Sequence, residues 1–503
     1  MKSRARFREL LDLAPRDAEA IEFDDRWTTW GTLKDIDAAL DRELSALGMG
    51  EGTRVGVIID SRPEHIAIVL SLISRGRCVV TLSPLQPPER LRADISDADL
   101  PVVVGSPDAL DRGDIRSGVG GAVVLELLED SVRRSDSGAR HAPIEQNPPT
   151  GAVVEMLTSG TTGPPKRVLL SEQQLDTAIG GSVPAPPKGS LFRDGVAIVT
   201  TPLVHIGGFW GVLGPLYAGR RVAIMPKFML EPWLRLIARH RPKATGLVPA
   251  ALRTIISANV PRERVDCLEV ITTGTTACPP DLIEEFLRLY GIRVLPTYGA
   301  TEFAGAVAYW TKSMHEKWWE SKAGSVGRPL PGISVRVTDN EGGVLAAGEV
   351  GRLEIRGAQS PAGPEAWLQT SDFAAVDDDG FLWIHGRADD AIIRGGFKVQ
   401  PDTVRKVLED HPGVREAAVA PLPDVRLGQV PVAGVELADE REVIDRAGLI
   451  DELMAKCRAQ LLPYEVPIHI AVLSELPRTA SSKVSRVELA RLIADDMGRS
   501  LSV

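Results

Sequence analysis

Short apolar runs and longer amphipathic segments alternate along residues 21–105 of the sequence. Short, continuous apolar runs are typical of strands buried on both faces, and apolar residues at helical spacing are typical of helices that cover a sheet. The apolar runs are Arg54–Ile59, Cys78–Leu82 and Leu100–Val104, and the amphipathic segments are Leu33–Leu47 and Glu64–Arg75. This alternation predicts an α/β fold of parallel sheets flanked by helices.

The pattern changes after Gly327. Short strand-like runs separated by Asp- and Gly-containing turns predict a small β-rich subdomain, and residues 390–503 predict a compact α+β unit. A chain of 503 residues is too long for one hydrophobic core, so several structural units are expected. Two stretches rich in proline and small polar residues, Ser131–Pro149 and Val183–Gly189, predict surface loops.

The composition limits the partners. A net charge of −10 argues against nucleic acid or an anionic membrane as the main partner. The basic start Met1–Arg8 is not followed by an apolar signal core, and no run of about 18 apolar residues could span a bilayer. The four cysteines have no metal-ligand or redox spacing. These features predict a cytoplasmic protein with reduced thiols.

A loop of small hydroxyl residues and glycines follows the strand-like segment Ala152–Leu157. Glycines let a backbone approach a ligand closely, and consecutive N–H groups with Ser and Thr hydroxyls bind anionic oxygen, so the loop suits a polyphosphate. A Walker A loop is excluded because Pro165 stands at its second glycine position and Arg167 follows the lysine. An ordinary polar turn is the alternative. The phosphate-loop candidates are Thr158, Ser159, Gly160, Thr161, Thr162, Gly163 and Lys166.

Four further motifs follow this loop in order: Tyr298–Glu302, Thr370–Asp372, Gly386–Asp390 and Pro477–Lys483. Together the five motifs resemble those of the adenylate-forming superfamily, which comprises acyl-CoA synthetases, adenylation domains of peptide synthetases and luciferases. The resemblance covers nearly the whole chain. It implies ATP and Mg²⁺ as cofactors, activation of a carboxylic acid as an acyl-adenylate, and release of pyrophosphate.

The resemblance also implies residue roles. Adenine would lie near Gly274, Thr275 and Thr276, with Tyr298 stacked on it and Gly299 beside it. Thr301 would bind the α-phosphate, Glu302 would hold Mg²⁺, Asp372 the ribose, and Arg387 the ribose or a phosphate. Lys483 would be the catalytic lysine. Asp389 would be the hinge between a large ATP- and acid-binding domain, residues 1–388, and a small mobile lid domain, residues 389–503.

The segment from His205 to Trp210 corresponds to the acid pocket of the resembling family. His205 would lie near the reacting carboxylate. Amino-acid-activating members have an Asp at the next position to hold an α-ammonium, whereas this chain has Ile206, and a buried ammonium without a carboxylate would be costly. We therefore expect an acid without an α-amine. Gly208, Phe209 and Trp210 suggest an apolar slot for an aryl or hydrophobic acid, with simple core packing as the alternative.

The acyl acceptor is less constrained. CoA ligases of the family commonly have a lysine in a Tyr-Lys-x-Pro stretch, whereas this chain has Glu465 in Tyr464–Pro467, and Ser482 replaces the usual glycine before Lys483. A negative residue near a nucleotide phosphate disfavours CoA, and no segment remains for a built-in carrier domain. The chain therefore resembles stand-alone ATP-dependent amide bond synthetases of the McbA type, whose acceptor is an amine. An acyl-CoA ligase and a catalytically inactive adenylate-binding relative remain alternatives.

Overall fold

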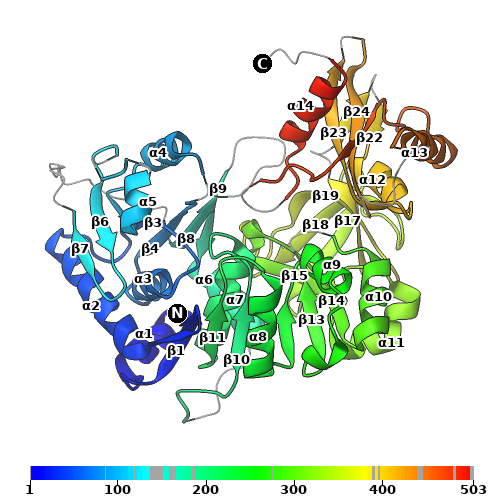
Figure 1. Cartoon of the computed structure of the whole chain (residues 1–503). Helices are drawn as coiled ribbons and strands as arrows, with labels where there is room; N and C mark the ends of the chain where they lie inside the picture. The colour runs from blue at the N-terminus through cyan, green and yellow to red at the C-terminus, as the bar shows by residue number, and fades with distance from the viewer. Residues whose placement is uncertain are drawn as a thin grey trace. The chain divides into compact units, whose positions relative to one another are not determined.

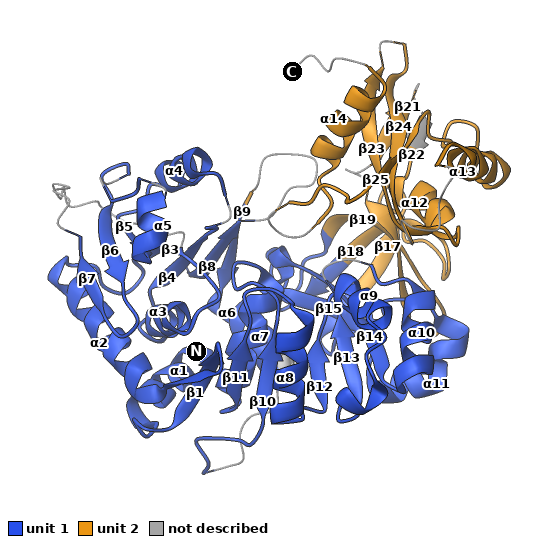
Figure 2. Ribbon diagram, in the orientation of Figure 1, with its two compact units in different colours: residues 1–158, 167–334, 355–368 blue, residues 159–166, 335–354, 369–503 orange. Residues whose placement is uncertain are grey.

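The computed structural model forms two compact units, which Figure 2 shows in two colours. Unit 1 comprises residues 1–158, 167–334 and 355–368, and unit 2 comprises residues 159–166, 335–354 and 369–503. The predicted α/β class is confirmed, with parallel sheets and helices in the N-terminal part and a small C-terminal α+β domain. The structure describes residues 2–84, 86–112, 114–116, 119–135, 151–157, 166–182, 189–274, 277–387, 391–394, 397–424, 426–438, 446–479 and 483–498.

The largest sheet of unit 1 has seven strands in the order β7-β6-β5-β3-β4-β8-β9 (Figure 1). The five central strands run parallel, and the edge strands β7 and β9 are antiparallel to their neighbours. The strands are β3 (Arg54–Ile58), β4 (Cys78–Leu82), β5 (Val102–Gly105), β6 (Val123–Leu127), β7 (Val132–Arg134), β8 (Ala152–Leu157) and β9 (Arg167–Ser171).

Both faces of this sheet are buried. Val79 of β4 belongs to the cluster that also contains the buried aliphatic residues of α3 (Pro63–Ser74), such as Ile66 and Leu70, whereas Cys78 and Val80 belong to a second cluster with Leu91 and Leu110. Leu91 and Leu110 lie on the helices α4 (Pro88–Asp97) and α5 (Pro107–Arg112). Helices therefore cover both faces, which explains why the strands are continuously apolar.

Two further sheets complete unit 1, in the orders β10-β11-β1-β2 and β12-β13-β14-β15-β16. Strands β12, β13 and β14 are parallel, and β15 turns back against β14. The strands are β1 (Glu19–Phe23), β2 (Arg26–Thr29), β10 (Val196–Val199), β11 (Arg221–Ile224), β12 (Ala244–Gly246), β13 (Val270–Thr273), β14 (Arg293–Ala300), β15 (Gly305–Tyr309) and β16 (Arg328–Pro329). The further helices are α2 (Trp30–Ala46), α6 (Glu172–Ser182), α8 (Leu230–His240), α9 (Pro249–Ser257), α10 (Pro280–Tyr290) and α11 (Lys312–Lys322).

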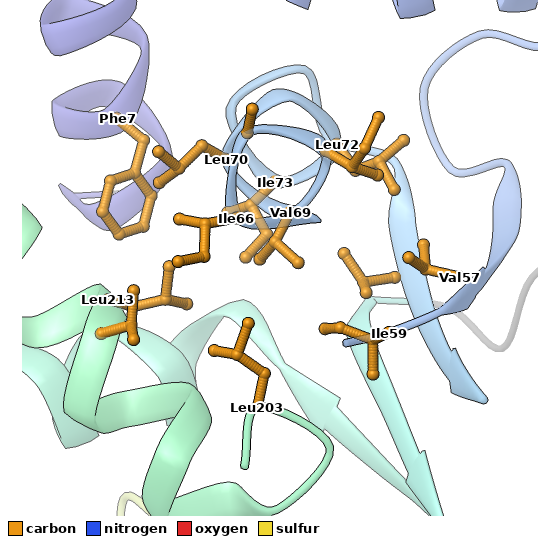
Figure 3. Close-up of a cluster of buried hydrophobic side chains, with 14 of the residues drawn as sticks. Phe7, Val57, Ile59, Ile66, Val69, Leu70, Leu72, Ile73, Leu203 and Leu213 are labelled. Atoms are coloured by element: carbon orange, nitrogen blue, oxygen red, sulfur yellow. The ribbon is translucent and has the colours of Figure 1, made fainter. Parts of the chain in front are cut away.

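The core of unit 1 joins distant parts of the chain, as Figure 3 shows. Phe7 from α1 (Lys2–Leu13) and Leu70 from α3 lie in one cluster with Leu203 and with Leu213 of α7 (Ile206–Tyr217). The basic N-terminus is thus a packed helix, because its apolar residues Phe7 and Leu10 are fully buried. This packing fixes the start of α7, where the predicted acid-pocket residues lie.

Unit 2 contains a sheet of order β17-β18-β19-β20 and a sheet of order β22-β21-β24-β23, with β25 parallel to β24. The helices are α12 (Pro401–Glu409), α13 (Arg446–Gln460) and α14 (Arg486–Asp496). The strands are β17 (Ile333–Thr338), β18 (Gly351–Gly357), β19 (Leu368–Val376), β20 (Leu382–Arg387), β21 (Ile392–Arg394), β22 (Phe397–Val399), β23 (Val414–Asp424), β24 (Gly428–Leu437) and β25 (Ile470–Leu473).

Two details correct the sequence-based expectations. The predicted loop Ser131–Pro149 is wrong at its start, because Val132–Arg134 pairs with β6 as an edge strand. Residues 136–150 lie outside the described part of the chain, as do residues 183–188 of the second predicted loop. Within the described residues, none of the helices combines the length and apolarity that crossing a membrane requires.

Candidate active site

A tight hairpin in unit 1 presents Thr301 and Glu302. Strand β14 runs to Ala300 because it pairs with β15 across the turn Thr301–Phe303. A side chain at Gly299 would collide with the carbonyl of Gly305, so a glycine is needed for this close pairing. The hairpin therefore holds the predicted phosphate and Mg²⁺ residues on a short, constrained turn.

Gln174 ties this turn to the rest of unit 1. Its amide accepts a hydrogen bond from the Ser171 N–H at 2.9 Å, and Ser171 Oγ accepts one from the Gln174 N–H at 3.2 Å. This reciprocal pair is a capping box at the start of α6. The amide nitrogen Nε2 of the same side chain donates to the carbonyls of Glu302, at 3.1 Å, and Gln359, at 2.8 Å. Gln174 was not predicted as a site residue, although Ser171-x-x-Gln174 is a recognisable capping signal.

A pocket of about 520 Å³ opens beside the Glu302 turn. Glu302 lines it together with Ser171, Gln174 and residues of the segment 358–364. A single carboxylate suits Mg²⁺, which keeps several waters and binds proteins through one or two carboxylates plus substrate phosphates. The described residues hold no cluster of three or more His, Cys, Asp or Glu side chains that could cage a metal by itself.

The predicted acid-pocket residues lie at the start of α7. His205 is the N-cap residue of this helix and Ile206 its first residue. A side chain at Gly208 would collide with the carbonyls of Thr201 and Pro202, so this glycine serves close packing of the helix start. Phe209 is only 1% exposed and belongs to the core of unit 1. Such burial is typical of a core residue, so the role of Phe209 in an acid slot stays a prediction.

Trp210 connects α7 to the Glu302 hairpin. Its indole N–H donates to the carbonyl of Ala304, and a side chain at Gly305 would lie 3.0 Å from its ring. Ala304 and Gly305 both have positive φ, at 54° and 124°, so the turn bends sharply beneath the indole. The structure therefore brings Trp210 together with the turn that carries Thr301 and Glu302.

Two of the predicted adenine residues, Gly274 and Tyr298, lie at or near the carboxyl ends of neighbouring strands. Gly274 follows β13, and Tyr298 lies in β14, which is parallel to β13. In open α/β sheets, ligands bind beyond the carboxyl ends of such strands. Thr275 and Thr276 lie outside the described residues, as does the phosphate loop from Thr158 to Pro165. Lys166, at the end of that loop, is exposed.

Asp372 and Arg387 face each other in unit 2. They are directly paired residues of the antiparallel strands β19 and β20. The Arg387 guanidinium donates to Ser371 Oγ at 2.7 Å, and the Asp372 N–H donates to Thr370 Oγ1 at 3.1 Å. The two predicted ribose and phosphate ligands are therefore brought together. Asp389, the predicted hinge, lies outside the described residues.

Lys483 lies on one of two short antiparallel segments of unit 2, residues 477–479 and 483–485, which are called the Lys483 hairpin below. Its carbonyl accepts hydrogen bonds from the N–H and the hydroxyl of Thr479, at 2.7 and 3.1 Å. Ser485 closes the hairpin by donating its N–H to the carbonyl of Pro477 at 2.7 Å. Ser482 lies outside the described residues. The backbone of the predicted catalytic lysine is thus held by these hydrogen bonds. Two side chains near this hairpin were not predicted as site residues: Glu436, which accepts a hydrogen bond from the Leu476 N–H, and Arg478, which donates to Glu416.

Glu465 takes part in its own turn. Its carboxylate accepts a hydrogen bond from the Leu462 N–H at 3.0 Å, and its own N–H donates to the Leu462 carbonyl at 2.8 Å. Arg394 donates to the carbonyls of Tyr464 and Val466, both at 3.0 Å. The turn is therefore locked from two sides, with a half-buried carboxylate within it.

This chain is similar in sequence to known protein families and to individual enzymes. Residues 7–363 match the family model for AMP-binding enzymes, and residues 404–483 match that of the AMP-binding enzyme C-terminal domain. A sulfoacetate–CoA ligase of Cupriavidus necator is 30% identical over 481 residues, 92% of each chain. An indoleacetate–CoA ligase of Aromatoleum aromaticum is 29% identical over 502 residues, 94% of this chain and 95% of that protein.

Solved structures of the same fold include the amide bond synthetase McbA from Marinactinospora thermotolerans. It superimposes with a TM-score of 0.79 at 25% identity, and the match covers 98% of this chain and 99% of that one. The first family match spans well over half of the chain and includes the phosphate loop and Tyr298–Glu302, and the second match ends at Lys483. The chain therefore belongs to the AMP-binding enzymes, the adenylate-forming superfamily that activates carboxylic acids.

Proposed function

We propose that this adenylate-forming enzyme joins an aryl or other hydrophobic acid to an amine. In the first step, a carboxylate oxygen attacks the α-phosphorus of ATP, and pyrophosphate leaves. In the second step, the amine nitrogen attacks the acyl carbon, an amide forms, and AMP leaves. The observation that carries the choice of acceptor is the carboxylate of Glu465, which is fixed within the Tyr464–Pro467 turn.

Several residues neutralise and align the reactants in the first step. Carboxylate and triphosphate repel each other, so positive charge and hydrogen-bond donors must be held in place before they meet. We assign the α-phosphate to Thr301 and the carboxylate–phosphate bridge to Lys483. Glu302 would hold Mg²⁺, which supplies charge neutralisation on the phosphates. We assign the ribose to Asp372 and Arg387, which lie on paired strands.

The residues at the start of α7 indicate which class of acid is the substrate. An α-amino acid would bring an ammonium that needs a carboxylate, and the position is occupied by Ile206. Trp210 supplies a large apolar ring beside the Glu302 hairpin, as an aryl group would require. The indoleacetate–CoA ligase, a relative over nearly the whole chain, is named for an aromatic acid. An acid with an aromatic or hydrophobic body and no α-amine is therefore our proposed substrate.

The amine acceptor is assigned from the Glu465 turn. CoA carries several phosphate charges, and a fixed carboxylate near its path would repel them. Arg394, a cation beside this turn, donates its Nη1 to two backbone carbonyls of the turn. A neutral or cationic amine meets no such repulsion. The similarity to the amide bond synthetase McbA supports this assignment.

An acyl-CoA ligase is the second candidate. The sulfoacetate–CoA and indoleacetate–CoA ligases cover 92% and 94% of this chain. If the chain followed them, the sulfur of CoA would take the place of the amine nitrogen in the second step. The two candidates share every step up to the acyl-adenylate and differ only in the acceptor.

The test is to incubate the purified protein with MgATP, a panel of aryl and alkyl acids, and either CoA or mixed amines, and to identify products by mass. Amide without thioester supports the proposal, whereas thioester makes the enzyme a CoA ligase. Release of ADP in place of AMP, or no acid-dependent pyrophosphate exchange, contradicts both. A Glu465→Lys variant sharpens the choice, because it should increase any thioester formation if the carboxylate excludes CoA.

A further inference from the structure

A buried carboxylate lies beneath the hairpin that carries Lys483. Glu436 of β24 is only 2% exposed. Its Oε1 accepts a hydrogen bond from the Leu476 N–H at 2.6 Å, immediately before the hairpin begins. Its Oε2 accepts two hydrogen bonds from Arg415, at 3.0 and 2.6 Å. The carboxylate therefore joins the core strand of unit 2 to the root of the hairpin.

Arg478 extends this network into the hairpin. Its guanidinium donates to Glu416 of β23 at 2.6 Å and lies 3.9 Å from Glu436 Oε1. Arg478 also forms the β-bridge partner of Val484, the residue after Lys483. The two carboxylates on adjacent strands thus hold the start of the hairpin and Arg478, which pairs with the residue next to the lysine.

We propose that Glu436 and Arg478 are positioning residues for the acid-activating step, acting through Lys483. This inference rests on the proposed function, in which Lys483 acts in the first step. Displacement of a reacting group by about 1 Å can cost roughly 100-fold in rate. The network holds the main chain around Lys483, and in the proposed function Lys483 acts in the first step. Loss of the network therefore impairs activation of the acid and spares acyl transfer from a ready-made adenylate.

The test compares the two half-reactions in Glu436→Gln and Arg478→Lys. The glutamine keeps an oxygen for the Leu476 N–H, and the lysine keeps the charge of Arg478 without its planar fork. Acid-dependent pyrophosphate exchange measures the first step. Consumption of a chemically prepared acyl-adenylate, with the acceptor used by the wild-type enzyme, measures the second. Arg491→Ala, which removes an exposed ion pair with Glu488 on α14, is the control for general effects on unit 2.

We expect pyrophosphate exchange to fall about 10- to 100-fold in both variants, while acyl transfer and the control change less than about twofold. Equal loss in both half-reactions, together with a lower melting temperature, would show a merely structural role and overturn the inference. Unchanged exchange would overturn it as well. If the wild-type protein shows no acid-dependent exchange, it is the proposed function that fails, and Lys483→Ala then has no activity to lose.

Discussion

The Glu302 hairpin of unit 1 and the Lys483 hairpin of unit 2 are held in different ways. Neutral donors fix the first: the amide of Gln174 and the indole of Trp210 bind the carbonyls of Glu302 and Ala304. Charged groups fix the second, through Glu436 and Arg478. Both arrangements anchor the main chain of a short hairpin that carries a predicted site residue.

The difference concerns how each hairpin responds to its surroundings. Gln174 is 4% exposed, and neutral buried hydrogen bonds are little affected by salt. The Arg478 and Glu416 side chains are 28% and 20% exposed, so their attraction is open to screening by ions. We therefore expect the Glu302 hairpin to respond to lost hydrogen bonds, and the Lys483 hairpin to respond to charge and ionic strength.

The largest expected effect is that of removing the lysine itself. Lys483→Ala should lower acid-dependent pyrophosphate exchange by about 100- to 1,000-fold, since loss of one donor to a developing charge typically costs this much. Acyl transfer from a prepared acyl-adenylate should persist. Exchange at the wild-type rate would contradict the role of Lys483. Circular dichroism of the variant checks that its fold is intact.

Gln174→Glu should have the next largest effect. This substitution separates the two roles of the Gln174 side chain. A glutamate preserves the capping box with Ser171 but replaces the donors to Glu302 and Gln359 with an acceptor oxygen. Unpaired buried carbonyls cost about 1–3 kcal/mol each. We expect a roughly tenfold higher Mg²⁺ requirement for exchange and lower stability of unit 1.

Thr177→Ala is the control for Gln174→Glu. It removes one local hydrogen bond, from Thr177 Oγ1 to the Gln173 carbonyl at 2.8 Å, on the same helix. Its Mg²⁺ requirement should match that of the wild-type protein. If both variants changed the Mg²⁺ requirement alike, the effect would belong to α6 as a whole and not to the Glu302 turn.

Acid should destabilise unit 1 through His65. Burial lowers the pKa of this fully buried histidine from 6.5 to about 4. Between these values the unfolded chain binds the proton and the folded chain does not, so stability is retained above pH 6.5 and lost as the pH falls toward 4. The contribution of His65 from pH 7 to pH 5 is about 2 kcal/mol. Urea unfolding at both pH values measures it, and His65→Phe should show a smaller drop than the wild type.

The smallest expected effect concerns the exposed part of the charged network. A double-mutant cycle on Arg478→Ala and Glu416→Ala should give a coupling of up to about 1 kcal/mol in unfolding of unit 2. The coupling should shrink between about 0.05 M and about 1 M salt, as screening becomes complete. A coupling that did not change with salt would remove the distinction drawn between the two hairpins.

Much of the fold could be predicted because its signals are local. Cys78–Leu82 is a strand with the predicted bounds, and α3 deviates from the predicted Glu64–Arg75 by one residue at each end. The loop prediction Ser131–Pro149 failed at its start because strand pairing overrides the local pattern there: Val132–Arg134 is a strand only because β6 offers it an edge.

By itself, the sequence determined the family, the order of the motifs and the residue types of the chemistry, because apolar periodicity, glycines and short motifs act within a few residues of one another. Only the tertiary structure decided which side chains support these motifs. Gln174 reaches a carbonyl 128 residues away, and Glu436 an N–H 40 residues away. Glutamine and glutamate are ordinary surface residues in a sequence, and they acquire these roles only when folding buries them beside unpaired backbone groups.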